Sequence, residues 1–189
     1  MSKLYLMRHG QTLFNVLERI QGWCDSPLTE LGQEQARQAG AWLHSQNIPF
    51  DHAYASTAER ACDTLELAMP GMPYERVKGL RECYFGKFEG QSESLNPQPP
   101  YGDFFVQFGG ERDVEVRDRM VSTITELMRR PEHENVLMVS HAGASIHFME
   151  AWTDPMAILK SKPLGNCCVA IYDFDGDATF SFVDLVNPV

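Results

Sequence analysis

The chain has 189 residues, of which 43% are hydrophobic and 22% are charged, a composition typical of a globular protein with one sizeable core. Its 16 basic and 26 acidic residues give a net charge of −10, and no Lys- or Arg-rich block interrupts that acidity, so we expect neither a nucleic-acid partner nor binding to an anionic membrane. The sequence has no apolar run long enough to span a bilayer, and its N-terminal apolar run is too short for a signal peptide, which predicts a cytoplasmic protein.

The first half of the chain alternates between predicted strands and helices. Residues 3–8 form a short apolar segment that predicts a buried strand, and a polar loop is expected over residues 11–27. Thr29 can cap a helix whose buried face is indicated by residues at helical spacing, namely Ala36, Ala39, Gly40 and Leu43. The next elements are a strand, a helix ended by prolines and glycine, and a weaker strand, over residues 51–55, 57–69 and 74–80.

The second half begins with an irregular segment, residues 83–110. It carries Asn-Pro, Pro-Pro and Gly-Gly pairs together with five phenylalanines, and a stretch of this kind inside a compact domain is usually a functional lid. Helical spacing returns over residues 113–130. The remaining elements are a buried strand, a helix, and two strands joined by a tight Asp-Gly-Asp turn, over residues 135–140, 144–152, 167–174 and 179–186.

Strands that alternate with helices predict βαβ units, and therefore a mostly parallel central sheet with helices on both faces. We expect an α/β fold of this kind, a three-layer α/β/α sandwich. No repeat, low-complexity tract or linker interrupts the pattern, which predicts a single domain over residues 1–189 with the lid as an insertion.

Polar residues follow the carboxyl ends of four predicted strands, which is where ligands of open α/β sheets bind. The first strand ends in Arg8 and His9, and the second is followed by Arg60, one turn into its helix. Glu82 follows the third strand and His141 the fourth. Four separated segments should therefore deliver two guanidiniums, two imidazoles and one carboxylate to one edge of the sheet.

These groups suit phosphoryl transfer. Guanidiniums bind a phosphoryl group through bidentate forks, a histidine can attack phosphorus and form a covalent intermediate, and a carboxylic acid can protonate the leaving oxygen. Hydrolysis of a phosphate monoester can need about 10²¹-fold acceleration, whereas a general acid typically supplies only about 10²–10⁴-fold. Most of the acceleration must therefore come from preorganised charge and covalent catalysis.

Six motifs in chain order resemble the histidine phosphatase superfamily, also called the phosphoglycerate mutase-like family, and together they cover nearly the whole chain. The first, LMRHGQTLFN at residues 6–15, is similar to the RHGxTxxN signature of that family. The others are DSPLTELG, STAERA, LRE followed by FG and EG, GGE and VSHAG, at residues 25–32, 56–61, 80–90, 109–111 and 139–143. The resemblance implies the phosphoglycerate mutase-like version of the α/β/α sandwich.

The resemblance also implies a role for each site residue. His9 would be the nucleophile that becomes phosphohistidine, and Glu82 would be the proton donor. Arg8, Arg60 and His141 would surround the phosphate. Further substrate contacts are implied at Asn15, Gln21, Gly22 and Ala142. The family works without a metal or other cofactor, so none is implied here, and the partner would be a small phosphorylated substrate.

The family divides chiefly into phosphatases and phosphoglycerate mutases, and the lids of the mutases carry Lys and Arg residues that hold the substrate carboxylate and a second phosphate. Residues 88–111 contain no Lys or Arg, so we expect a phosphomonoester hydrolase rather than a mutase. The phenylalanines of the lid could face an apolar or ring-bearing leaving group, or only pack on the domain. Two further alternatives are a metal hydrolase that uses the same histidines and carboxylates, and a non-catalytic phosphate-binding module.

The five cysteines are expected to be reduced thiols, since their number is odd and no CxxC pair occurs. Cys24 and Cys83 lie close in sequence to predicted site segments, which leaves a redox role open for them. Glu75 and Glu89 are alternatives to Glu82 as the acid, because both lie nearby in the sequence. The oligomeric state stays open between a monomer and a homodimer.

Overall fold

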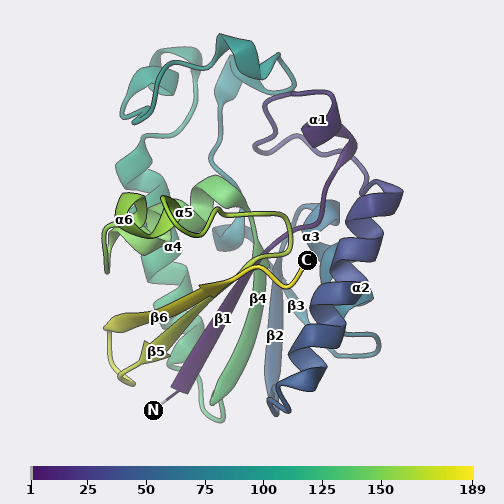
Figure 1. Cartoon of the computed structure of the whole chain (residues 1–189). Coiled ribbons are helices and arrows are strands. Elements are labelled where there is room, and N and C mark those ends of the chain that lie inside the picture. The colour runs from purple at the N-terminus through teal and green to yellow at the C-terminus, as the bar shows by residue number, and fades with distance from the viewer. Residues whose placement is uncertain (1) are drawn as a thin grey trace.

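The computed structural model describes residues 2–189 and has a six-stranded sheet at its centre (Figure 1). The strands are β1 (Ser2–Arg8), β2 (His52–Ser56), β3 (Glu75–Val77), β4 (Asn135–Ser140), β5 (Val169–Phe174) and β6 (Phe180–Val186). Their order across the sheet is β3-β2-β4-β1-β5-β6. The first four in that order run parallel, whereas β5 pairs antiparallel with both β1 and β6. The mostly parallel sheet is confirmed, with an antiparallel pair at one edge.

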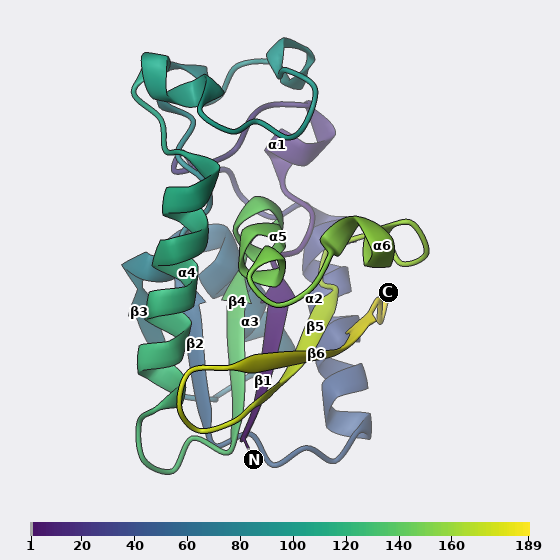
Figure 2. The ribbon, with the colours of Figure 1, turned by 90° about the vertical axis from the view of Figure 1, so that its left-hand side faces the viewer.

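The helices are α1 (Leu13–Val16), α2 (Glu30–Ser45), α3 (Glu59–Ala68), α4 (Asp113–Met128), α5 (Ala142–Glu150) and α6 (Pro155–Leu159). Helices cover both faces of the sheet, whereas the short α1 lies beyond the strand ends (Figures 1 and 2). Side chains alternate along β1, so that Tyr5 and Met7 pack with α2 and α3, whereas Leu4 and Leu6 pack with α4 and α5. The predicted three-layer α/β/α sandwich is therefore confirmed. Over residues 2–189, no helix combines the length and the apolar character that crossing a bilayer requires.

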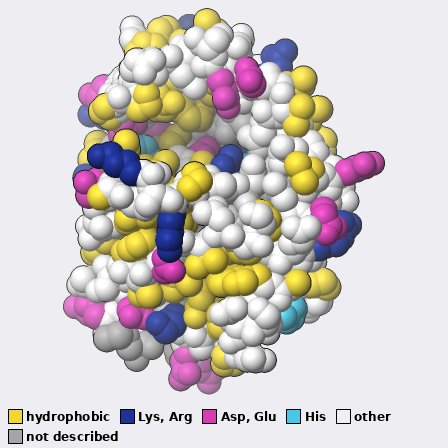
Figure 3. All heavy atoms as spheres, viewed as in Figure 1, with side chains coloured by type: hydrophobic (Ala, Val, Ile, Leu, Met, Phe, Trp, Pro, Cys, Tyr) yellow, Lys and Arg dark blue, Asp and Glu magenta, His cyan; other side chains and the backbone are white. Residues whose placement is uncertain are grey.

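The lid, residues 83–110, lies above the carboxyl ends of the parallel strands and beside α1 (Figures 1 and 2), and Figure 3 shows the molecule hollowed beneath it. It contains three 3-10 turns, at Gly86–Phe88, Glu93–Leu95 and Phe104–Phe108. The ring centroid of Phe88 lies 5.7, 5.4 and 4.8 Å from those of Phe104, Phe105 and Phe108. Phe85 also packs in the lid, with its ring centroid 4.9 Å from that of Phe105. All five phenylalanines therefore pack against one another, and Phe85 is the one that also lines the cavity described below.

Three elements differ from the expectation, and all of them are very short: α1, β3 and α6, the last of which was not predicted at all. Helix α1 interrupts the predicted polar loop, where Thr12 and Asn15 cap each other's backbone N–H groups. A helix of four residues contains no full apolar period and so leaves no sequence signal. The strand expected over residues 74–80 is reduced to β3, because Lys78–Leu80 turns into a 3-10 helix.

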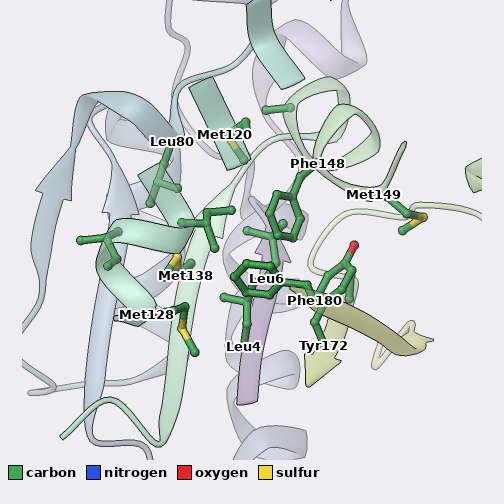
Figure 4. Packing of buried hydrophobic residues seen from close by; sticks show 14 of the residues in the cluster. Leu4, Leu6, Leu80, Met120, Met128, Met138, Phe148, Met149, Tyr172 and Phe180 are labelled. Atoms are coloured by element: carbon green, nitrogen blue, oxygen red, sulfur yellow. The ribbon is translucent and has the colours of Figure 1, made fainter. Parts of the chain in front are cut away.

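The core on the α4 and α5 side of the sheet is built from large aromatic and aliphatic side chains (Figure 4). The ring of Phe148, on α5, lies 5.1 Å from that of Tyr172 on β5 and 5.2 Å from that of Phe180 on β6. Edge-to-face contacts of this kind add to the free energy gained by burying the rings. Because this packing fixes α5 on the sheet, it also fixes the residues at the first turn of that helix, which belong to the candidate site.

Candidate active site

The carboxyl ends of the parallel strands bring the predicted residues together. Arg8 is the last residue of β1 and His9 follows it, whereas His141 follows β4 and precedes α5. Because β1 and β4 are neighbours, the two imidazole rings meet edge to face, with their centroids 5.2 Å apart. Arg60 belongs to the first turn of α3, shortly after β2.

His9 is buried and held by its own loop. Its Nδ1 lies 2.8 Å from the carbonyl oxygen of Gly10. A carbonyl oxygen only accepts, so Nδ1 carries the proton and Nε2 of the neutral ring keeps its lone pair. Burial, followed by the positive charges of Arg60 and Arg8, lowers the pKa of His9 well below its usual range. The ring is therefore neutral at neutral pH and has a nitrogen suited to nucleophilic attack.

His141 is fully buried, and its Nε2 lies 2.8 Å from Oγ of Ser56 at the end of β2. Burial, followed by the charges of Arg60 and His9, lowers its pKa well below the usual range. A neutral ring that accepts the hydroxyl proton of Ser56 at Nε2 carries its own proton at Nδ1. In that tautomer, His141 presents a hydrogen-bond donor rather than a second nucleophile.

Arg60 is fully buried and holds the loop that follows α1. Its Nη1 and Nη2 donate to the carbonyl oxygens of Cys24 and Gly22 at 3.0 and 2.8 Å. Nη1 also forms an ion pair of 2.9 Å with Asp25. The two terminal nitrogens of the guanidinium thus hold the loop, while its positive charge helps to lower the pKa of both histidines.

Three buried donors beside the histidines have no partner. Arg8 donates from Nη1 to the carbonyl oxygen of Leu164 at 2.7 Å. Within residues 2–189, however, Nε of Arg8, Nε of Arg60 and Nδ1 of His141 have no hydrogen-bond partner. A buried donor left unpaired costs about 1–3 kcal/mol. Three such donors on residues around His9 favour the binding of an anion with several acceptor oxygens.

Glu82 lies at the N-terminus of α5. Its Oε2 accepts from the N–H of Gly143 at 2.9 Å, and its Oε1 accepts from the N–H groups of Ala144 and Cys83 at 2.7 and 2.9 Å. A Cβ on Gly143 would lie 2.8 Å from Oε1 of Glu82. A larger residue at the glycine of the VSHAG motif would therefore displace this carboxylate from its amide donors.

A cavity of about 390 Å³ opens between these residues and the lid. It is lined by Arg8, His9 and Glu82 and by three of the predicted substrate contacts, Asn15, Gln21 and Ala142. Gly22 instead lines a separate hollow of about 70 Å³ with His141. Glu82 borders both spaces, so it lies between the one that contains His9 and the one that contains His141.

The predicted auxiliary contacts are partly engaged with protein groups. Oδ1 of Asn15 accepts from the N–H of Thr12 at 3.0 Å. The Gln21 amide accepts from the Thr12 hydroxyl at 2.7 Å and donates to that of Ser26 at 2.8 Å. These side chains therefore shape the loop that borders the cavity, in addition to lining it.

Glu89 organises the same loop, a role that the sequence analysis did not assign to it. Its Oε1 accepts from the N–H groups of Trp23 and Phe85 at 2.9 and 3.1 Å, and its Oε2 from those of Gly22 and Cys24 at 3.2 and 2.9 Å. The only sequence signal was its place in the EG pair of the family resemblance. Because Glu89 lines neither the cavity nor the hollow described above, it is a structural element of the site rather than its acid.

Arg119, on α4, is a second residue that the sequence analysis missed. It donates to the carbonyl oxygens of Gly79, Arg81 and Glu82 at 2.9, 2.9 and 3.2 Å. Its Nη2 also forms an ion pair of 3.0 Å with Glu111. Arg119 thus clamps the backbone that carries the candidate acid. Nothing in its helical spacing distinguishes it from a surface arginine.

The remaining candidate groups are placed as follows. Glu75 pairs with Arg130 on the surface at 3.2 Å, which leaves Glu82 as the one of the three sequence candidates that lines the cavity. All five cysteines are free thiols. Burial raises the pKa of Cys24 to about 12 and that of Cys83 well above its usual range, which disfavours the thiolate that redox chemistry needs. Residues 2–189 contain no group of three or more His, Cys, Asp or Glu side chains arranged to hold a metal ion.

Comparisons with known proteins agree with this geometry. The model of the histidine phosphatase superfamily (branch 1) matches residues 4–187. A broad-specificity phosphatase of Saccharomyces cerevisiae, YOR283W, is 32% identical over 152 residues, which are 75% of this chain and 66% of that protein, just under two thirds of its length. A probable phosphoglycerate mutase of Proteus mirabilis, GpmB, is 34% identical over 186 residues, 92% of this chain and 86% of that protein.

The fold comparison leads to the same family. Bacillus stearothermophilus YhfR has a solved structure that superposes with a TM-score of 0.82, at 33% identity and with all of both chains covered. Phosphatases and mutases both occur among the relatives. Since the family model spans nearly the whole sequence, the chain belongs to the histidine phosphatase superfamily, branch 1.

Proposed function

We propose that the protein is a metal-independent phosphomonoester hydrolase in which His9 is the nucleophile and Glu82 the proton donor. The observation that carries the proposal is the set of unpaired buried donors on Arg8, Arg60 and His141 beside a neutral imidazole. A bound phosphoryl group brings acceptor oxygens to these donors and adds charge-assisted bonds to both guanidiniums.

In the first step, Nε2 of His9 attacks phosphorus and the P–O bond to the leaving alcohol breaks. Protonated Glu82 gives its proton to the leaving oxygen and remains as a carboxylate. Arg8 and Arg60 stabilise the charge that gathers on the phosphoryl oxygens. In the second step, a water molecule attacks phosphorus, the N–P bond breaks, and Glu82 takes the proton of that water. Inorganic phosphate leaves, and both residues return to their starting states.

The lining of the cavity supports a hydrolase over a mutase. Among the described residues that line it, Arg8 is the only Lys or Arg. A phosphoglycerate brings a carboxylate beside its phosphoryl group, and that second charge has no second cation to meet. The mutase remains the second candidate because one relative, 34% identical, is named a probable phosphoglycerate mutase.

The test is hydrolysis of para-nitrophenyl phosphate in excess EDTA, with trapping of acid-labile phosphate on the protein. We expect turnover that resists EDTA and disappears in His9→Ala. His44→Ala, which changes an exposed histidine on α2, is the matched control and should retain activity. Turnover abolished by EDTA would instead indicate a metal hydrolase, and tight phosphate binding without turnover on any ester would indicate a binding module. Isomerisation of 3-phosphoglycerate that is faster than its hydrolysis would favour the mutase.

A further inference from the structure

Three carboxylates line the part of the cavity that the proposed reaction does not use. Glu93 comes from the lid, Asp113 is the first residue of α4, and Glu150 is the last residue of α5. His147 lies between the latter two, with Nδ1 2.8 Å from Oε2 of Glu150 and Nε2 3.6 Å from Oδ1 of Asp113. The cavity is therefore polarised, with the guanidinium of Arg8 at the strand ends and carboxylates where the lid meets α4 and α5.

Glu93 is the carboxylate with the fewest protein partners. Burial, followed by the charge of Glu18, raises its pKa, and only Arg8 acts in the opposite direction. No hydrogen bond contributes to that shift. Asp113, in contrast, accepts from the N–H of Gly102 at 2.6 Å. Glu93 is thus an exposed carboxylate of the cavity wall that forms no ion pair with the described residues.

One further feature of the lining suits a positively charged ligand. The rings of Tyr101 and Phe85 also line the cavity, and aromatic ring faces attract ammonium groups.

Resting on the proposed function, we propose that this cavity selects phosphomonoesters of positively charged amino alcohols. The phosphoryl group lies against Arg8 and His9, and the ammonium group lies among Glu93, Asp113 and Glu150. An ester whose alcohol carries a carboxylate meets like charges at the same place and is disfavoured.

The expected preference is moderate, because the three carboxylates are partly open to solvent. A single exposed ion pair typically changes an equilibrium by about 1.4- to 5-fold. Three carboxylates favour the ammonium ester and oppose the carboxylate ester, so we expect about tenfold or more in kcat/KM between the two. Raising the salt concentration should shrink this difference.

The experiment compares three esters of similar size and different charge. They are 2-aminoethyl phosphate, 2-hydroxyethyl phosphate and 2-phosphoglycolate. The readouts are kcat/KM of the unaltered protein and, independently, Kd by calorimetry on His9→Ala, which is expected not to hydrolyse them. We expect both to rank the esters in that order. Glu93→Gln and Glu150→Gln should each reduce the spread, whereas Glu126→Gln, an exposed acid on α4 outside the cavity, should leave it unchanged.

The inference is overturned if 2-phosphoglycolate equals or exceeds 2-aminoethyl phosphate in both readouts, or if the ranking survives unchanged in Glu93→Gln and Glu150→Gln. Failure of the proposed function looks different. In that case para-nitrophenyl phosphate and all three esters resist hydrolysis, while the order of the Kd values still decides the inference about charge.

Discussion

Glu89→Gln tests whether one carboxylate holds the loop at residues 22–24. Four backbone N–H groups converge on Glu89, two on each oxygen. A glutamine keeps one acceptor oxygen and turns an NH2 donor toward the other two amides, so two hydrogen bonds to a charged acceptor are lost. Each such bond contributes about 1.5–3 kcal/mol, which gives about 3–6 kcal/mol for the pair. Glu89 is only partly buried, so water can replace part of the two lost hydrogen bonds. We therefore expect the free energy of unfolding to fall by about 3 kcal/mol.

The measurements are equilibrium unfolding in urea and thermal unfolding, both followed by circular dichroism, together with kcat/KM. For a chain of this size, about 3 kcal/mol lowers Tm by roughly 6–12 °C. Activity should fall as well, because Arg60 is held by carbonyl oxygens of the same loop. Glu75→Gln, which removes an exposed partner of Arg130, should cost less than about 1 kcal/mol. If Glu89→Gln were as stable and as active as Glu75→Gln, the four amides would not depend on this carboxylate and the reasoning would be wrong.

Four other variants test separate parts of the argument. Glu82→Gln should lose about 10²–10⁴-fold in kcat/KM on alkyl phosphates but much less on para-nitrophenyl phosphate, whose leaving group needs no proton; equal losses on both would contradict its role as the acid. The pKa of His141 is lowered by folding, so below about pH 6.5 the unfolded chain binds more protons than the folded chain. The free energy of unfolding should therefore decrease as the pH is lowered through that range, by up to about 1.4 kcal/mol per pH unit for each such histidine. His141→Gln should flatten that slope in urea unfolding measured across pH, and an unchanged slope would count against the shift. Phe148→Ala should cost about 3–5 kcal/mol in urea unfolding, and a loss below about 1 kcal/mol would mean that α5 is held by other contacts. Nδ2 of Asn166 donates to the carbonyl oxygen of His9 at 3.1 Å. Asn166→Ala should therefore lower kcat more than it changes KM, and a larger change in KM than in kcat would assign Asn166 to substrate binding.

The long elements could be predicted from the sequence because each carries a complete local signal. Helix α2 begins directly after Thr29, whose hydroxyl accepts from the N–H of Gly32, and β4 is a continuous apolar run. Helix α1 and the 3-10 turns of the lid carry no such signal, since they are shorter than one apolar repeat. The packing of Phe88 against the other lid phenylalanines also could not be predicted, because aromatic content is the same whether rings face a ligand or each other.

The candidate site divides in the same way. Its reacting groups lie at strand ends, a position that topology fixes, so His9 and His141 could be placed at the same edge of the sheet from sequence alone. That they lie side by side depends on the strand order, which the sequence did not predict. Their supports could not, because they are distant in the chain: Glu89 binds amides 65 to 67 positions away and Arg119 a carbonyl 40 positions away. Pairings of this kind follow from the packed lid and α4, for which the sequence offers only composition and helical spacing.

In the proposed reaction the two arginines affect His9 at two stages. They keep the ring neutral in the free site, and they bind the phosphoryl group that stabilises the cationic ring after phosphorylation. In the free site their charges add to burial in keeping the pKa of His9 low, so the ring is neutral and can attack. A bound phosphoryl dianion offsets that field, because its charge is opposite to theirs. Once Nε2 is bonded to phosphorus, the ring still carries its Nδ1 proton against the Gly10 carbonyl oxygen and becomes cationic. That cation forms beside the dianion which the arginines have bound, so the same guanidiniums keep the free nucleophile reactive and hold the group that stabilises the phosphorylated ring.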